Sequence, residues 1–191
     1  VSYFDGTSRE PTLIPEVREG EVVLRPMYLQ MEQIGIDVLA VVDSWLLKFE
    51  GISRDTSQGS HFAMTGGFEY TDVGVFDSIM DIGWLMEYQF DDRDELATTT
   101  GQNDLMFGTR LVFNDVDGTE VLLGYVQDLD NSGSYSGFIE ASSRINDNWK
   151  WNIDAWFFDS ELPQEVAYSL RKDDFVTVSY THLTLPTTLS V

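Results

Sequence analysis

The sequence predicts an all-β protein, an antiparallel up-and-down transmembrane β-barrel of which this chain supplies about nine strands. Apolar and polar residues alternate with a period of two over segments of roughly ten residues. Tight turns alternate with longer polar links along the chain. Long strands, hairpin connections and an asymmetry between short turns and long loops are together typical of an outer-membrane barrel.

The alternation defines the expected strands. They are 33–43, 45–52, 61–71, 81–91, 104–114, 119–129, 135–145 and 149–158, and a further strand begins near Asp173. In 81–91 one face carries the apolar run Ile82, Trp84, Met86, Tyr88 and Phe90. The alternation is weakest in 119–129, where Leu122 and Val126 interrupt the polar face.

The connections predict that tight turns lie at one end of the sheet and longer loops at the other. Tight turns are expected at Asp43–Ser44, Asp115–Gly118 and Asn146–Asn148, which are rich in Asp, Asn and Gly. Longer polar links are expected at 6–32, 53–60, 92–102 and 159–172, with the brief loop 130–134 on the same side. A soluble sandwich has shorter strands and no such systematic asymmetry.

A bilayer explains both faces of these strands, because a sheet can span lipid only as a closed barrel with one face on lipid and one on the lumen. Trp84, Met86, Phe107, Leu111 and Ile153 suit lipid, and Trp45, Phe113, Trp149 and Phe157 suit the interfacial girdles. The residues expected to face the lumen are Asp37, Lys48, Glu50, Glu69, Asp81, Glu87, Asp104, Arg110, Glu120, Glu140, Arg144, Lys150 and Asp154. The alternative is a soluble barrel or sandwich that packs the same apolar face as a core.

The composition narrows the function. Across 191 residues, 33 Asp and Glu against 11 Lys and Arg give a net charge of −22, which disfavours binding to nucleic acid. The chain has no cysteine, so neither disulfides nor thiolate chemistry is expected. It starts at Val1 in what reads as the end of a strand, Val1 to Asp5, so we expect a fragment whose N-terminal part is missing.

No residue pattern predicts catalysis, a cofactor or a metal. His61 stands beside the long-loop end, and Ser60 next to it points to the opposite strand face, so a Ser–His–acid site is disfavoured. The stretch 128–133 resembles the opening of a calcium loop, but position 12 falls on Ile139, so a hairpin loop is the better interpretation. The acids Asp91, Asp92, Asp94 and Glu95 are expected to form a solvated loop.

Several segments carry a resemblance to a known family. These are GGFEYTDVGVFDS (66–78), LMEYQFDDR (85–93), QNDLMFGTRLVFND (102–115) and YSLRKDDF (168–175). They resemble the C-terminal part of an uncharacterised family of porin-like proteins of Gram-negative bacteria, over most of residues 1–177. The resemblance implies a bacterial outer-membrane location and a barrel architecture. Such barrels normally close with an aromatic residue, and this chain departs from that by ending in Val191.

The end of the chain has a separate interpretation. Residues 178–187, VSYTHLTLPT, resemble the in-frame translation of a transposase adapter used in sequencing libraries. We therefore expect 1–177 to be the C-terminal portion of one β-barrel domain and 178–191 to be a non-native, adapter-derived tail. In a structure this tail should occupy a vacant strand position by edge pairing, without a closing aromatic, or be poorly ordered.

The sequence thus predicts a porin-like barrel without enzymatic activity that passes small solutes by diffusion. The excess of acids on the lumen face predicts a preference for cations. The expected partners are outer-membrane lipid, lipopolysaccharide and small solutes. Two alternatives remain open: a plugged structural or adhesive outer-membrane barrel, and a soluble all-β carbohydrate-binding or hydrolase domain with paired carboxylates.

Overall fold

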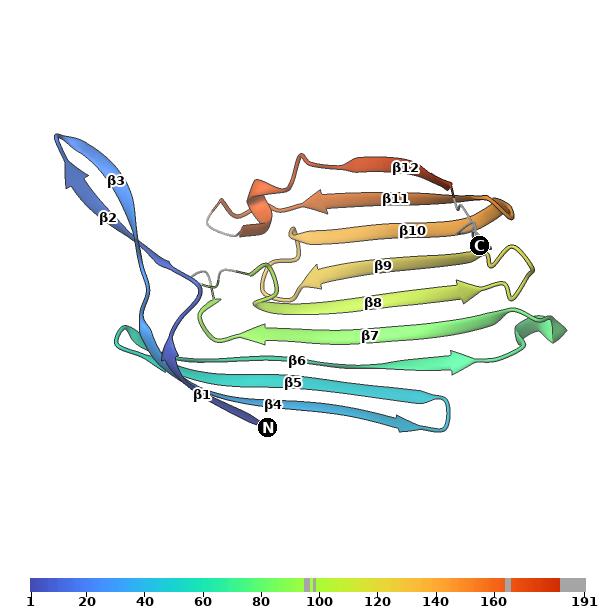
Figure 1. The fold of residues 1–191 in the computed structure, drawn as a ribbon, viewed down its shortest axis with the longest axis horizontal. Helices are drawn as coiled ribbons and strands as arrows, with labels where there is room; N and C mark the ends of the chain where they lie inside the picture. Colours follow the sequence, from blue (N-terminus) through green and yellow to red (C-terminus); the bar gives the residue numbers. More distant parts are fainter. Residues whose placement is uncertain (95–96, 98, 164–165, 183–191) are drawn as a thin grey trace, which may run out of the picture.

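The computed structural model contains one large antiparallel sheet and describes residues 1–94, 97, 99–163 and 166–182. The ten strands of this sheet lie side by side in the order β1-β4-β5-β6-β7-β8-β9-β10-β11-β12 (Figure 1). Their bounds are β1 Ser2–Thr7, β4 Gln30–Val42, β5 Trp45–Thr56, β6 Gly59–Asp72, β7 Asp81–Asp91, β8 Asn103–Val112, β9 Glu120–Asp128, β10 Tyr135–Asn146, β11 Trp149–Asp159 and β12 Phe175–His182. The predicted all-β antiparallel architecture is therefore confirmed.

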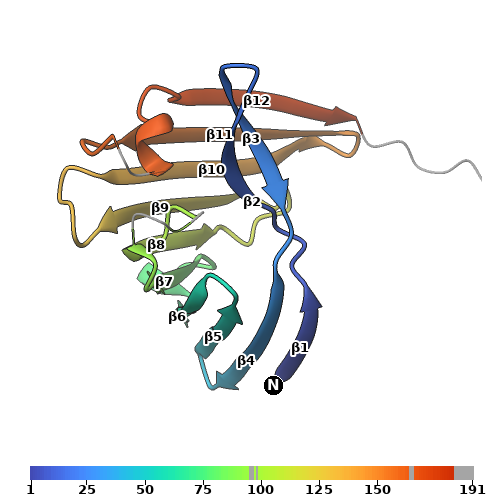
Figure 2. The ribbon, with the colours of Figure 1, turned by 90° about the vertical axis from the view of Figure 1, so that its left-hand side faces the viewer.

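The sheet is curved but open. Figure 2 shows the strands following an arc, with β1 at one edge and β12 at the other. Among the described strands β1 pairs only with β4, and β12 pairs only with β11. Because no strand joins these two edges, closure into a barrel is not a property of this structure.

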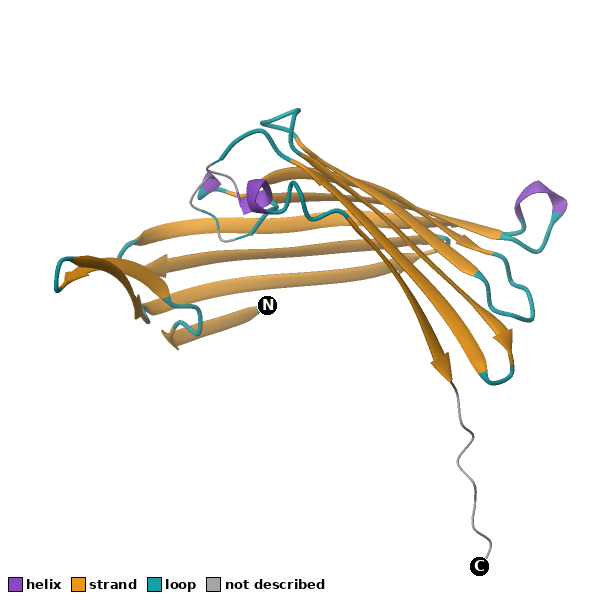
Figure 3. Cartoon of the chain, turned by 90° about the horizontal axis from the view of Figure 1, so that it is seen from above, coloured by secondary structure: helices purple, strands orange, loops and turns teal. Residues whose placement is uncertain are grey.

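A separate hairpin stands between β1 and β4. Its strands are β2 (Thr12–Arg18) and β3 (Glu21–Met27), joined by Glu19 and Gly20, which both have positive φ (54° and 89°). That conformation is the tight hairpin turn whose twist matches the flanking strands. The hairpin extends from the same end of the sheet as the short 3₁₀ helix η3 (Val166–Ser169), opposite η1 (Val75–Asp77) (Figure 3). The expectation of one polar link over 6–32 was therefore wrong.

The predicted long link over 53–60 was also wrong. β5 continues to Thr56 and β6 begins at Gly59, so only Ser57 and Gln58 form the turn. The Thr56 hydroxyl donates to the carbonyl of Gly59 at 2.9 Å and accepts from the amide of Gln58 at 3.2 Å. Gly59 takes a φ of 137°, which L side chains rarely adopt. These contacts close a tight hairpin where polarity alone indicated a loop.

The two termini of the described chain both lie in edge strands. Val1 to Asp5 was expected as the end of a strand, and Ser2 to Thr7 pairs with β4 along its whole length, which brings the sheet to ten strands instead of about nine. Val178 to His182 of the suspected adapter tail extend β12 and pair with β11. Edge pairing of this part agrees with the expectation, and 183–191 lie outside the described residues.

Candidate functional site: the charged face of the sheet

The register separates the sheet into two faces, because residues directly opposite each other on neighbouring strands point to the same side. We call them the apolar face and the charged face. The apolar face is formed by residues such as Val38, Phe49, Phe68, Met86, Phe107, Leu123, Ile139 and Ile153. The five residues predicted to suit lipid, Trp84, Met86, Phe107, Leu111 and Ile153, all lie on it.

Charged groups on the apolar face are confined to its margins in the described strands. Asp5, Glu32 and Asp55 lie opposite one another in a row where β1, β4 and β5 approach the hairpin. Asp72 and Asp159 are the last residues of β6 and β11. Aromatic pairs stand near both ends, with Trp45 against Tyr70 at 4.8 Å between centroids at one end. Tyr125 and Tyr135, 5.9 Å apart, stand at the other end.

The charged face carries every residue that the sequence placed in a lumen. The register assigns to it Asp37, Lys48, Glu50, Glu69, Asp81, Glu87, Asp104, Arg110, Glu120, Glu140, Arg144, Lys150 and Asp154. The same register places Leu122 and Val126 on this face, as the alternation predicted. Their shared side is thus a feature of the fold, and a lumen in front of them stays a prediction.

Acidic residues meet directly across neighbouring strands on this face. Asp37 lies opposite Glu50, Asp104 opposite Asp128, and Glu140 opposite Asp154. Like charges in such positions repel and destabilise the sheet, and the repulsion is weaker in water and salt than in an apolar environment. The arrangement therefore suits a face that contacts solvent and mobile cations.

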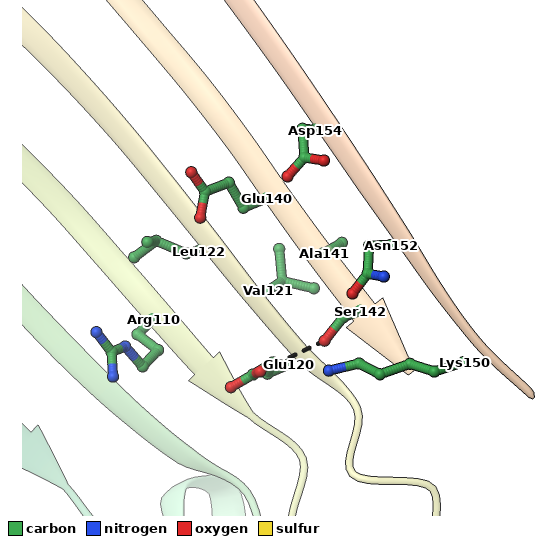
Figure 4. A pocket seen from close by; sticks show the side chains of 10 residues that line it. All are labelled: Arg110, Glu120, Val121, Leu122, Glu140, Ala141, Ser142, Lys150, Asn152 and Asp154. Atoms are coloured by element: carbon green, nitrogen blue, oxygen red, sulfur yellow. Dashed lines mark hydrogen bonds between the residues drawn. The ribbon is translucent and has the colours of Figure 1, made fainter. Parts of the chain in front are cut away.

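One hollow on the charged face gathers five charged side chains. It measures about 340 Å³ and is lined by Arg110, Glu120, Glu140, Lys150 and Asp154 together with smaller residues (Figure 4). The Ser142 hydroxyl donates to the Glu120 carboxylate at 3.4 Å. Within the described part of the chain none of the five charged groups forms an ion pair. Their charges therefore stay available to dissolved ions.

A second hollow, of about 380 Å³, contains basic groups near the long-loop end. Arg93 binds the Asp91 carboxylate with two hydrogen bonds of 2.9 and 2.6 Å, and this bonding raises the pKa of the guanidinium. Arg54 donates to the Gln33 side chain at 2.8 Å. The Nε2 atom of His61 is buried beside them without a hydrogen-bond partner among the described residues. The neighbouring Ser60 hydroxyl lies on the apolar face and donates to the Asp55 carboxylate at 3.1 Å.

A third hollow, of about 290 Å³, lies beneath the long loops. Gly101 of the loop after β7 passes so close to Gln89 that an added Cβ would meet its Oε1 atom at 2.0 Å. Ala167 and Leu170, from the segment around η3, line the opposite wall. The loops at this end therefore fold back over the charged face instead of extending away from it.

The floor of this third hollow holds residues that the sequence interpretation left out. Phe138, Trp156 and Phe158 project from the charged face, although most aromatic residues of these strands lie on the apolar face. The alternation contained the signal, since Phe138 shares its parity with Glu140 and Trp156 with Asp154. No comparable signal indicated that the loops would cover them.

The loops at 115–119 and 128–134, which contain closely spaced acids, are turns held by their own hydrogen bonds. The Asp128 carboxylate accepts from the amides of Asp130 and Asn131 at 2.8 and 2.9 Å. The Asp115 carboxylate accepts from the hydroxyl and the amide of Thr119 at 2.6 and 2.7 Å, which lowers its pKa. In the described ranges no three metal-ligating side chains gather, and Glu95 of the acidic loop lies outside them.

Comparison of the chain with protein-family models, with curated proteins and with solved structures finds no match. The described residues contain no helix long and apolar enough to cross a membrane. The geometry of the sheet indicates what the site can do. It offers an acidic surface that suits contact with water, backed by an apolar surface whose charges lie only at its margins in the described strands.

Proposed function

We propose that this sheet is part of an outer-membrane β-barrel of Gram-negative bacteria, porin-like, whose charged face lines a path for the passive diffusion of small solutes. The observation that carries the proposal is the division between faces. From β4 to β12 the apolar face is free of charge except at its margins, while the charged face repeatedly places acid opposite acid. Lipid on one side and water on the other satisfies both surfaces at once.

The dimensions support the same environment. β9 is the shortest strand from β4 to β11; its nine residues rise by about 3.3 Å each, or roughly 30 Å in total, and a tilt of about 40° leaves a height of roughly 23 Å. The other strands from β4 to β11 have 10 to 14 residues and are long enough to span the same height. The apolar band of an outer-membrane barrel is about 25 Å tall. A soluble sandwich core needs a second layer on the apolar face, and in the described residues no second layer covers it (Figure 3).

The charged face favours cations over anions in this proposal. Glu120, Glu140 and Asp154 outnumber Arg110 and Lys150 in the hollow of Figure 4, and a lumen with excess carboxylates concentrates cations. No covalent step or bound cofactor is part of this mechanism. Lipid and lipopolysaccharide would contact the apolar face and its acidic margins.

Planar-bilayer recording tests the proposal, using the barrel with all the strands that its gene encodes. We expect discrete conductance steps and a reversal potential that reports cation preference in a potassium chloride gradient. The double variant Glu140→Gln with Asp154→Asn should reduce that preference. The variant Glu16→Gln with Glu21→Gln removes the same charge from the β2–β3 hairpin and should change it less. Absence of steps, or preference for anions, would contradict the proposal.

One observation favours a second candidate, an outer-membrane barrel with a plugged lumen. The loop after β7 and the segment around η3 fold over the charged face at the long-loop end, where Thr100, Gly101, Ala167 and Leu170 line the third hollow. Further strands and loops could complete such a plug. In that case the protein shows heat-modifiable migration in detergent gels, as a membrane barrel does, but no conductance.

A further inference from the structure

We propose that the third hollow is a binding site for a small organic ammonium ion that also carries an oxygen acceptor. The hollow lies between the loop after β7, the η3 segment and strands β8 to β11, and its volume of about 290 Å³ equals that of roughly ten water molecules. This proposal shares one assumption with the proposed function, namely that the charged face contacts water. Three features of the walls carry it.

The first feature is an aromatic shelf formed by Phe138, Trp156 and Phe158. Phe138 lies directly opposite Trp156, with 4.8 Å between ring centroids and 24° between ring planes. Phe158 follows on the same strand, 6.1 Å from Trp156 and at 13°. Phe138 in turn lies against Gly124, where an added Cβ would be 2.3 Å from its ring. Stacked rings cover part of each other and leave the outer faces of the stack uncovered, and the negative potential of such a π face attracts a desolvated cation.

The shelf does not close into a packed core. Met106, Val126, Ala167 and Leu170 surround it, which is enough apolar surface to form a small satellite cluster. The hollow is partly open to solvent and is therefore accessible from outside the protein. Most of its wall is apolar, and in this it resembles small-molecule sites.

The second feature is the sign of the charge at the walls. Asp104 and Asp128 lie directly opposite each other on β8 and β9 and both line the hollow. Among the described residues that line it there is no Lys, Arg or His. The other two hollows contain basic pairs, Arg110 with Lys150 and Arg54 with Arg93. Of these three hollows, the third combines carboxylates and aromatic rings without a basic residue among its described lining, which disfavours an anion as its ligand.

The third feature is a buried donor. Gln102 lines the hollow, is only 8% exposed, and its Nε2 atom has no hydrogen-bond partner in the described part of the chain. Leaving a buried N–H group without an acceptor is unfavourable. A hydroxyl or carbonyl oxygen on the ligand would accept this hydrogen bond, with a small side-chain adjustment, while its ammonium group rests on the shelf. Choline has both groups in one small molecule.

Calorimetric titration of choline into the folded protein in detergent micelles tests the assignment. Its neutral carbon isostere, in which a tert-butyl group replaces trimethylammonium, has the same shape and should bind at least about tenfold more weakly. Trp156→Leu should weaken choline binding roughly tenfold, because it keeps apolar bulk and removes the largest π face. Gln102→Leu should weaken choline but leave tetramethylammonium, which has no acceptor, within about twofold.

Two matched variants serve as controls. Trp151→Leu makes the same exchange on β11 but on the apolar face, and Glu140→Gln removes one carboxylate from the charged face at the first hollow. Both should leave choline binding within about twofold, whereas Asp104→Asn should weaken it about fivefold or more. If Trp156→Leu does not fold, Trp156→Phe retains a smaller ring and should weaken binding about threefold.

Three results would overturn the assignment: equal binding of choline and its isostere, tighter binding of glucose than of choline, or equal effects of Trp156→Leu and Trp151→Leu. Glucose tests whether the shelf instead receives the face of a sugar ring. Binding in micelles does not require conductance. A protein that binds choline but never conducts would contradict the proposed pore alone, and a conducting protein that ignores choline would contradict this site alone.

Discussion

Adjacent leucines on opposite faces of β9 give the sharpest test of the membrane environment. Leu122 and Leu123 lie in the middle of a nine-residue strand, and neither is fully buried. Leu122 belongs to the charged face, opposite Arg110 and Glu140, and Leu123 belongs to the apolar face, opposite Thr109 and Ile139. Replacing each with lysine therefore makes the same chemical change in two environments one residue apart.

The expected magnitudes differ strongly. Leu123 is the fourth residue of β9, roughly 10 Å along the strand from Glu120, or about 8 Å in height at a tilt of about 40°, which places it well inside an apolar band about 25 Å tall. A lysine there costs about 2–4 kcal/mol, or roughly a 30- to 1,000-fold change in the unfolding equilibrium. Leu122→Lys places an ammonium between Arg110 and Glu140 in water, where repulsion and attraction offset each other, and should change stability by less than about 1 kcal/mol.

Urea titration of the protein refolded in phospholipid vesicles, followed by tryptophan fluorescence, measures both variants. Val121→Lys, on the apolar face but next to the first residue of β9, provides a depth control and should cost only about 0–1 kcal/mol. Equal stabilities of Leu122→Lys and Leu123→Lys would refute the assignment of lipid to the apolar face. Equal losses of stability for Val121→Lys and Leu123→Lys would indicate that the apolar face contacts a protein core of uniform polarity instead of lipid.

Three further predictions test individual contacts. Gly124→Val should lower the free energy of unfolding by about 1–3 kcal/mol in the same urea titration, because its Cβ would overlap the Phe138 ring. Gly137→Ala is the control: a Cβ there would have its nearest neighbour at 3.4 Å, so the free energy of unfolding should fall by less than about 1 kcal/mol. Arg93→Met should destabilise the protein by about 1–3 kcal/mol by leaving the buried Asp91 carboxylate without its two-bond partner, with Arg93→Lys intermediate; unchanged urea midpoints would contradict this. Thr119→Val should raise the lowered pKa of Asp115 toward that of an ordinary carboxyl in a ¹³C NMR titration. Because folding lowers this pKa, the Asp115 carboxylate contributes fully to stability above a pH of about 4, and the contribution is lost as the pH falls through the lowered pKa. Asp115→Asn should abolish this pH dependence of stability.

The faces of the strands were predictable from the sequence because side chains alternate with an invariant period of two. Once Glu140 and Asp154 are placed on one side, the register forces Arg110 and Leu122 to the same side, whatever the loops do. The alternation also placed Leu122 and Val126, the two apolar exceptions in 119–129, on the correct face. It did so because pleating depends on backbone geometry and not on hydrophobicity.

The connections were less predictable because polarity does not distinguish a loop from a solvated hairpin. Thr56, Gly59 and the Asp55–Ser60 hydrogen bond of 3.1 Å convert the polar stretch 53–60 into strand and turn. The third hollow could not be predicted from the sequence for another reason. Gly101 and Leu170 meet the charged face through contacts between distant segments, which a local pattern does not contain.

The edges of the sheet place a strict condition on the membrane proposal. In the described strands β1 pairs with β4 only from Gln30 to Gly35, so the outer edge of β4 from Ile36 to Val42 has no strand beside it. β12 likewise has a neighbour on one side alone. Unpaired backbone groups cost several kcal/mol each in hydrocarbon, so lipid excludes such edges. The strand that lies beside this part of β4 in a completed barrel must therefore pair along Ile36–Val42. The side chains that it points to the same side as Val38 must be uncharged, so that they continue the apolar face. That requirement is much stronger than edge pairing by itself, because an exposed edge can template almost any alternating segment.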